Sequence, residues 1–237
     1  MNSTSRYRAV FSRRHVVLPV IHVLTVELAK RNAMVAREAG ADGVFLINHN
    51  GSWTDLLRIH GEVMAVVPDW WVGVNFLDLD PESAFGKLPP TVAGLWTDNA
   101  EVDERSAEQM DAQWILKAQG ASGWPGLYFG GVAFKYQRLV SDLAGAGNAA
   151  RQFMDVVTTS GPGTGRRAEV EKIRAMKQAL GEFPLAIASG ITPENVGDYL
   201  EVADCFLVAT GVSKNFYELN PARVKALVER VRAFAAA

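Results

Sequence analysis

The sequence predicts a single (β/α)₈ TIM barrel, and three observations support that prediction. Eight runs of apolar, β-branched or aromatic residues recur along the chain, and stretches with helical periodicity separate them. Most of the runs are nearly continuous, as strands buried on both faces require. The alternation implies a parallel sheet with right-handed crossovers, and 237 residues suit one closed barrel.

The eight expected strands end in polar or glycine-containing turns. They are residues 16–22, 43–48, 70–76, 92–96, 127–132, 154–158, 185–189 and 205–210. Amphipathic stripes predict helices between them, and the clearest comprises Val224, Leu227, Val228, Val231 and Phe234. The fifth helix must come from residues 137–152, which contain two glycines.

Several helix ends carry recognisable signals. Asp80-Pro81, Thr192-Pro193 and Asn220-Pro221 each place a capping side chain before a proline at the first helical position. Gly40 and Gly181 suit the ends of helices. We therefore expect helices to begin at all three prolines.

The domain prediction is a barrel over residues 16–237, preceded by a basic segment over residues 1–15. This segment lacks acidic residues, and it is interpreted as a frayed arm or a short helix closing the barrel floor, with a transit peptide as the alternative. No linker or low-complexity segment divides the rest of the chain.

Composition narrows the function. The chain is 49% hydrophobic and 21% charged, with a net charge of −2, so nothing indicates a nucleic-acid partner. No apolar stretch approaches the ~20 residues that span a bilayer. Cys205 is the single cysteine and is read as a small buried hydrophobe, which fits a reducing cytoplasm. A homo-oligomer stays open.

The tail of the chain predicts a phosphate site. Ser189-Gly190 and Thr210-Gly211 each follow an apolar strand, and Ser213 lies just beyond the second turn. Two such turns bring free backbone N–H groups together, and the loops after strands 7 and 8 often bind phosphate in this fold. We therefore expect a phosphoryl group to contact the N–H groups of Gly190 and Gly211.

The loop after the sixth strand is rich in hydroxyls and glycines. It matches neither a P-loop nor a dinucleotide-binding fingerprint, yet it suits anion binding or a lid over substrate, with a flexible connector as the alternative. Its candidate ligand-binding residues are Thr159, Ser160, Gly161, Gly163, Thr164 and Gly165.

Other polar residues follow the remaining strands and should converge on the same mouth. The candidates for acid, base and charge stabiliser are His22, Asp98 and Lys135, in that order. His22 has a structural alternative as a hydrogen-bonded ring, and Lys135 alternatives as a Schiff-base or a solvated lysine. The candidate substrate contacts in these loops are Asn48, His49 and Asn75, although Asn48 and His49 also suit a turn. Trp96 is a candidate for stacking on a substrate.

The expectation for metals and cofactors is that none is required. His22, His49, Asp78 and Asp98 show no metal-binding spacing, so no protein metal site is predicted. Mg²⁺ bridging a diphosphate substrate to one carboxylate would leave no motif and stays open.

The sequence resembles the BtpA-like proteins. The resemblance is strongest over residues 155–221 and rests on the motifs Thr159-Ser160-Gly161, Gly163-Thr164-Gly165 and Ser189-Gly190-Ile191-Thr192-Pro193-Glu194-Asn195, with Tyr199-Leu200, Ala203-Asp204 and Asn220-Pro221. The amino-terminal strand keeps only His22 of the family's usual opening, and residues 48–51 depart from its pattern. The tail also looks like that of phosphoribosylanthranilate isomerase and indole-glycerol-phosphate synthase. The resemblance implies a TIM barrel with a phosphate site.

Together these features predict a barrel that binds a phosphorylated small molecule, either a sugar phosphate or a nucleotide-like compound. The expected activity is that of an isomerase, a lyase or a glycosyl (phosphoribosyl-type) transferase with its active site at the carboxyl-terminal mouth. The alternative is a non-catalytic BtpA-like assembly or binding protein that keeps a phosphate site.

Overall fold

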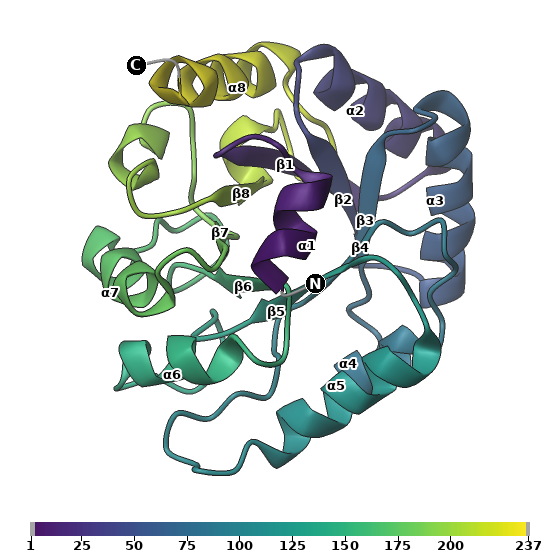
Figure 1. Cartoon of the computed structure of the whole chain (residues 1–237). Helices are drawn as coiled ribbons and strands as arrows, with labels where there is room; N and C mark the ends of the chain where they lie inside the picture. Colours follow the sequence, from purple (N-terminus) through teal and green to yellow (C-terminus); the bar gives the residue numbers. More distant parts are fainter. Residues whose placement is uncertain (1–2, 236–237) are drawn as a thin grey trace.

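A computed structural model describes residues 3–235 of the chain, in which eight parallel strands close into a barrel surrounded by helices (Figure 1). Each strand pairs with its neighbours in sequence order, and β1 pairs with β8 to close the ring. The strands are β1 (Val16–Val23), β2 (Gly43–Asn48), β3 (Trp71–Asn75), β4 (Gly94–Thr97), β5 (Leu127–Gly131), β6 (Val156–Thr159), β7 (Leu185–Ile187) and β8 (Cys205–Val208). This confirms the predicted fold class, and each expected strand is present.

Seven α-helices follow β1, β2, β3, β4, β5, β6 and β8, and 3₁₀ turns follow β7 and β8. The helices are α2 (Val26–Glu38), α3 (Trp53–Val66), α4 (Pro81–Phe85), α5 (Met110–Ser122), α6 (Leu143–Ala150), α7 (Val170–Leu180) and α8 (Pro221–Ala235). The two 3₁₀ turns are η1 (Val196–Tyr199) and η2 (Thr210–Val212). No helix within residues 3–235 is both long enough and apolar enough to span a membrane.

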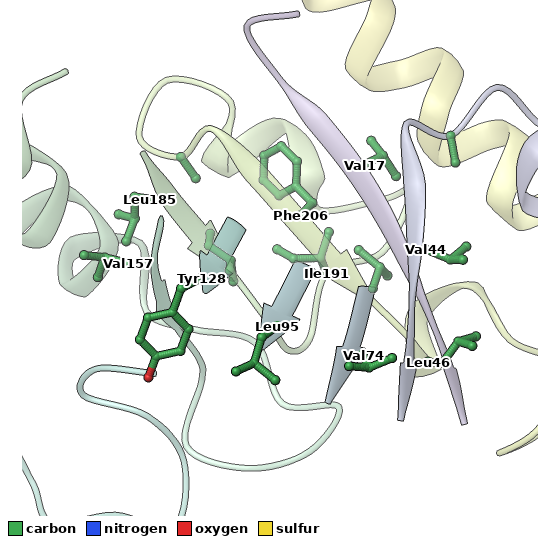
Figure 2. Packing of buried hydrophobic residues seen from close by; sticks show 14 of the residues in the cluster. Val17, Val44, Leu46, Val74, Leu95, Tyr128, Val157, Leu185, Ile191 and Phe206 are labelled. Carbon is green, nitrogen blue, oxygen red and sulfur yellow. The ribbon is translucent and has the colours of Figure 1, made fainter. Parts of the chain in front are cut away.

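Alternate residues of each strand divide the core into two layers. One layer fills the barrel with side chains such as Leu18, Phe45 and Phe129. The other packs between the strands and the helices, and Figure 2 shows members of it, among them Val44 and Leu95. This period of two follows from the pleat of a strand. Because apolar side chains fill both layers, the polar side chains gather at the mouth.

Two helix predictions need correction. The Thr192-Pro193 signal does not begin an α-helix, because the Asn195 side chain accepts from the Thr192 N–H at 2.8 Å and donates to the Gly190 carbonyl at 2.8 Å. Those two bonds hold a tight turn, and only η1 follows it. The helix expected over residues 137–152 is shorter, because α6 begins after Asp142, whose carboxylate caps the Gly145 N–H at 2.8 Å.

The amino-terminal helix α1 (Ser3–Val10) lies across the end of the barrel that faces the viewer in Figure 1. Tyr7 and Phe11 pack into the barrel interior. The guanidinium of Arg6 pairs with Asp155 at 2.8 Å and donates to the Gly126 carbonyl at 2.7 Å. Residues 1–2 of the predicted amino-terminal segment and residues 236–237 of the predicted barrel lie outside the described residues.

Candidate functional site at the barrel mouth

The carboxyl ends of the strands surround a cavity of about 240 Å³. Its lining includes ten of the seventeen residues predicted to form the site, which come from loops widely separated in sequence. They are His22, His49, Asp98, Lys135, Thr164, Gly165, Ser189, Gly190, Thr210 and Gly211. We call this space the mouth cavity.

Three glycines let the loops after β6, β7 and β8 approach one another closely. Gly190 has a φ of +67°, and a Cβ there would overlap the backbone of Arg166 and Arg167. A Cβ at Gly211 would overlap the Ile191 carbonyl, and Gly165 has a φ of +72° beside Thr210. These positions therefore require glycine, since a side chain would push the loops apart.

The same glycines expose backbone donors on one wall of the mouth cavity. Among residues 3–235, the N–H groups of Gly165, Gly190 and Gly211 have no protein acceptor. Unsatisfied N–H groups at successive turns attract anions. One of these turns, at Thr210-Gly211, is the start of the 3₁₀ turn η2. This wall, which comprises Gly165, Gly190, Thr210 and Gly211, is chemically suited to a phosphoryl group, and we call it the phosphate wall.

Two serines predicted to bind phosphate direct their hydroxyls elsewhere. The Ser189 hydroxyl lies 2.9 Å from both the Gly163 and the Arg166 carbonyl oxygens, so it ties the loop after β7 to the loop after β6. Ser213 donates to the Ala209 carbonyl at 2.9 Å and is absent from the described lining of the mouth cavity. Backbone groups and the Thr210 side chain are therefore the better candidates for anion contact.

His22 is buried against a loop that lies between η2 and α8. Its Nδ1 atom is 2.8 Å from the Phe216 carbonyl oxygen, and its ring lies 4.0 Å from the Phe216 ring and 4.7 Å from the His49 ring, measured between centroids. A carbonyl only accepts, so Nδ1 carries the proton and Nε2 keeps its lone pair. Burial, reinforced by His49, lowers the pKa of His22 to about 4. The ring is therefore neutral at pH 7.

Asp98 and Lys135 supply the charges of the mouth cavity. Asn75 donates to an Asp98 carboxylate oxygen at 3.1 Å. Burial raises the pKa of Asp98, and the Lys135 charge opposes that rise. The Lys135 ammonium lies 4.9 Å from the centroid of the Phe134 ring and has no hydrogen-bond or ion-pair partner within residues 3–235. It is therefore available to a ligand.

The other predicted residues do not belong to the lining described for the mouth cavity, and two of them, Ser160 and Gly161, line a neighbouring cavity. Asn48 donates to Asp78 at 2.7 Å and accepts from the Leu77 N–H at 2.9 Å, so it holds two loops together. Thr159 donates to the Ala133 carbonyl at 3.2 Å, and Ser160 accepts from the Lys135 N–H at 2.7 Å. Those contacts fix the loops that carry the lining. The lining described for the mouth cavity contains none of Asn48, Asn75, Thr159, Ser160, Gly161, Gly163 and Ser213.

Sequence reasoning missed Tyr136 and the Phe216 carbonyl. Tyr136 lines the mouth cavity with a φ of +61°, and its hydroxyl accepts from the Thr164 N–H at 3.2 Å. A tyrosine beside a candidate lysine at a strand end was a usable signal. Nothing in the sequence pairs Phe216 with His22, because a main-chain carbonyl is common to every residue.

No group of three or more histidine, cysteine, aspartate or glutamate side chains within residues 3–235 is placed to hold a metal ion. His22 and His49 are neighbours, but His22 directs one nitrogen to a carbonyl.

Comparison with known proteins supports the fold and the resemblance of the tail. The BtpA family model matches residues 132–233, which contain the loops of the proposed phosphate wall. This match confirms the resemblance to the BtpA family over that part of the chain. No curated protein sequence matches the chain.

Solved structures share the barrel at low sequence identity. (S)-3-O-geranylgeranylglyceryl phosphate synthase from Thermoplasma acidophilum, in complex with sn-glycerol-1-phosphate, is 17% identical, covers 98% of this chain and 99% of its own, and has a TM-score of 0.65. Phosphoribosyl anthranilate isomerase from Thermus thermophilus is 17% identical, with 92% and 99% coverage and a TM-score of 0.65. The tryptophan synthase alpha subunit from Legionella pneumophila is 13% identical, with 98% and 99% coverage and a TM-score of 0.67.

Proposed function

We propose that this protein is an enzyme that acts on a phosphorylated small molecule, a sugar phosphate or a nucleotide-like compound. The single observation that carries the proposal is that unpaired N–H groups and ionisable side chains line the same cavity. Gly165, Gly190 and Gly211 form one part of its lining, and His22, Asp98 and Lys135 form another. The reaction class is an isomerisation, a lyase reaction or a glycosyl transfer.

The phosphoryl group would be held by backbone donors of the loops after β6, β7 and β8. Because the Ser189 hydroxyl and the required glycines hold these loops in place, the donors are organised before the ligand arrives. Binding energy from the phosphate would then position the reacting end of the substrate. Solved structures with the same barrel include one in complex with sn-glycerol-1-phosphate, which is compatible with this use of the fold.

His22 is better suited to accept a proton than to serve as the acid that the sequence predicts. It is neutral at pH 7 because of its low pKa, and its Nδ1–H bond to Phe216 keeps Nε2 as the acceptor. Asp98, whose pKa is raised by burial, becomes the better candidate for proton donor. Lys135 would stabilise negative charge that develops on a substrate oxygen.

The proposed reaction needs no resident cofactor. Mg²⁺ would enter only with a diphosphate substrate, and Asp98 is the carboxylate of the mouth cavity that would contact it. A non-catalytic binding protein would need the phosphate wall alone. The ionisable groups on the same cavity therefore favour the enzyme over that alternative.

Two measurements test the proposal. Calorimetric titration should show that ribose 5-phosphate binds and ribose does not. Thr210→Glu, which adds a negative charge to the phosphate wall, should abolish the binding, whereas Gln178→Glu on the exposed side of α7 should not. Equal binding by both variants would rule out the phosphate wall.

Catalysis is tested separately by proton exchange. For an isomerisation or a lyase reaction, a set of sugar phosphates incubated with the protein in D₂O should include one that incorporates deuterium at a carbon, as followed by NMR. His22→Asn should stop the incorporation while leaving phosphate affinity and melting temperature close to those of the parent. Phosphate binding without any exchange or turnover would favour the non-catalytic alternative.

A further inference from the structure

A second cavity of about 330 Å³ adjoins the mouth cavity. It lies between the loop after β5 and the loop after β6, and the two cavities share Lys135 and Tyr136 in their linings. We call it the side cavity. It has no role in the proposed phosphate contacts.

Apolar side chains make up much of the side cavity's lining. Phe134, Leu139, Val140, Leu143 and Pro162 all contribute to it. Leu139 is 93% exposed, so nearly all of its apolar surface is in contact with water. Burying that surface would be energetically favourable. An apolar ligand group in the cavity would cover this side chain.

Two lysines give the side cavity a positive character. Lys172 donates to the Ala133 carbonyl at 2.5 Å and to the Ser160 carbonyl at 2.7 Å, which uses two of its three hydrogens. Lys135 has no partner within residues 3–235, as described above. Arg138 is already paired with Glu104, and Glu169 is the one carboxylate in the lining described for this cavity.

The boundary between the two cavities is a weak contact on a strained loop. The Tyr136 hydroxyl lies 3.2 Å from the Thr164 nitrogen and 3.4 Å from its Oγ1 atom, and the tyrosine is 78% exposed. Ala133 and Tyr136 both have a positive φ, of +49° and +61°. Non-glycine residues in this region are strained, and such strain often occurs where a loop serves a ligand.

We propose that the side cavity binds a small apolar organic anion, such as an aromatic or branched carboxylate, beside the phosphorylated compound. The apolar lining would hold its hydrocarbon part, and Lys135 and Lys172 would face its charge. The inference rests on the proposed function, because it places the anion beside the phosphorylated compound at the same mouth. It favours a transfer or lyase reaction over the isomerisation of a single compact sugar.

Benzoate is the probe for this site, benzyl alcohol is its uncharged counterpart, and calorimetry is the measurement. Benzoate should bind at least about tenfold more tightly than benzyl alcohol, because charge-assisted contacts are the stronger kind. Leu139→Glu should weaken benzoate at least about tenfold by placing a like charge in the lining. Leu116→Glu, on a partly exposed leucine of α5, should leave it unchanged.

NMR spectra of the methyl groups supply a readout that needs no variant. Benzoate should shift the signals of Leu139, Val140 and Leu143, and saturating inorganic phosphate should change its affinity by less than about threefold, since the two anions occupy different cavities. No benzoate binding, shifts outside the side cavity, or full competition by phosphate would overturn the proposal.

The two proposals fail in different ways. Leu139→Glu should leave inorganic phosphate binding intact, and Thr210→Glu should leave benzoate binding intact. Loss of phosphate binding in the parent protein would refute the mouth-cavity function even if benzoate bound.

Discussion

The Nδ1 atom of His22 and the carbonyl oxygen of Phe216 are 2.8 Å apart, although the two residues are separated by 194 positions in the sequence. This contact joins the end of β1 to the loop between η2 and α8. It fixes which nitrogen of the imidazole carries the proton, and the Phe216 ring packs on the same histidine. The chemistry available to His22 is therefore set by a main-chain atom from the other end of the chain.

The low pKa of His22 predicts a pH dependence of stability. Its pKa is lowered from 6.5 to about 4 in the folded protein, so the unfolded chain binds more protons between these values. The free energy of unfolding should therefore fall as the pH is lowered from 6.5 toward 4, by an amount on the order of 3 kcal/mol from this residue. Urea titrations of the parent and of His22→Asn should show a smaller loss in the variant. A parent and a variant with parallel pH profiles would contradict the assignment.

Gly190→Ala should destabilise the fold and weaken phosphate binding together. Alanine would be strained at a φ of +67°, and its Cβ would overlap the backbone of Arg166 and Arg167. We expect a loss of at least about 2 kcal/mol in the free energy of unfolding. Gly197→Ala is the matched control, because a Cβ there meets nothing within 4 Å. Equal melting temperatures for the two variants would show that the turn is not constrained.

Arg6→Met should reveal the cost of leaving Asp155 unpaired. Asp155 is 2% exposed and also accepts from the Tyr128 N–H at 2.9 Å, so its charge depends on few partners. Removing one partner of a buried pair typically costs about 3 kcal/mol, and the partial exposure of Arg6 lowers that to about 2 kcal/mol. Arg8→Met, two residues further along α1, should change stability by less than about 0.5 kcal/mol. Chemical denaturation of both variants measures these changes in the free energy of unfolding.

Lys135→Met should weaken the binding of benzoate and leave the binding of inorganic phosphate largely unchanged. Its ammonium lines both cavities and has no partner within residues 3–235. Loss of a charged contact predicts about a tenfold weaker affinity for benzoate, whereas backbone N–H groups are the proposed contacts of the phosphate. Lys117→Met, on the exposed side of α5, should leave both affinities unchanged. A loss of phosphate affinity as large as the loss of benzoate affinity would contradict the assignment of Lys135 to the side-cavity anion.

Most of the barrel follows from local patterns in the sequence. Strands buried on both faces leave apolar runs that can be read directly, and Asn220 caps α8 as the Asn-Pro signal predicts. The Thr192-Pro193 signal is equally strong locally but is overridden by the Asn195 side chain. The Asn195 side chain makes hydrogen bonds to the preceding turn. A rule that considers only the capping residue and the proline does not include such contacts.

The mouth residues were predictable by position, and their roles less so. A residue at a strand end can be assigned to the mouth, as with His22, Asp98 and Lys135. Whether its polar atoms face a ligand depends on what the neighbouring loop offers. Ser189 and Ser213 look alike in the sequence as candidate ligands, yet both donate to carbonyls of the protein. The side cavity likewise needs two loops that only the fold brings together.

The closure of the ring has a consequence for how the chain acquires its structure. Val16 pairs with Cys205, so the first strand finds its second neighbour only after 189 further residues have been added (205 − 16). Until then β1, in which His22 is the one ionisable residue, has one edge without a partner. Contacts between such distant segments form slowly, and unpaired edges promote association between chains. The newly made polypeptide should thus be most prone to aggregation before β8 has been synthesised, and slower translation upstream of that strand should lower the yield of soluble protein.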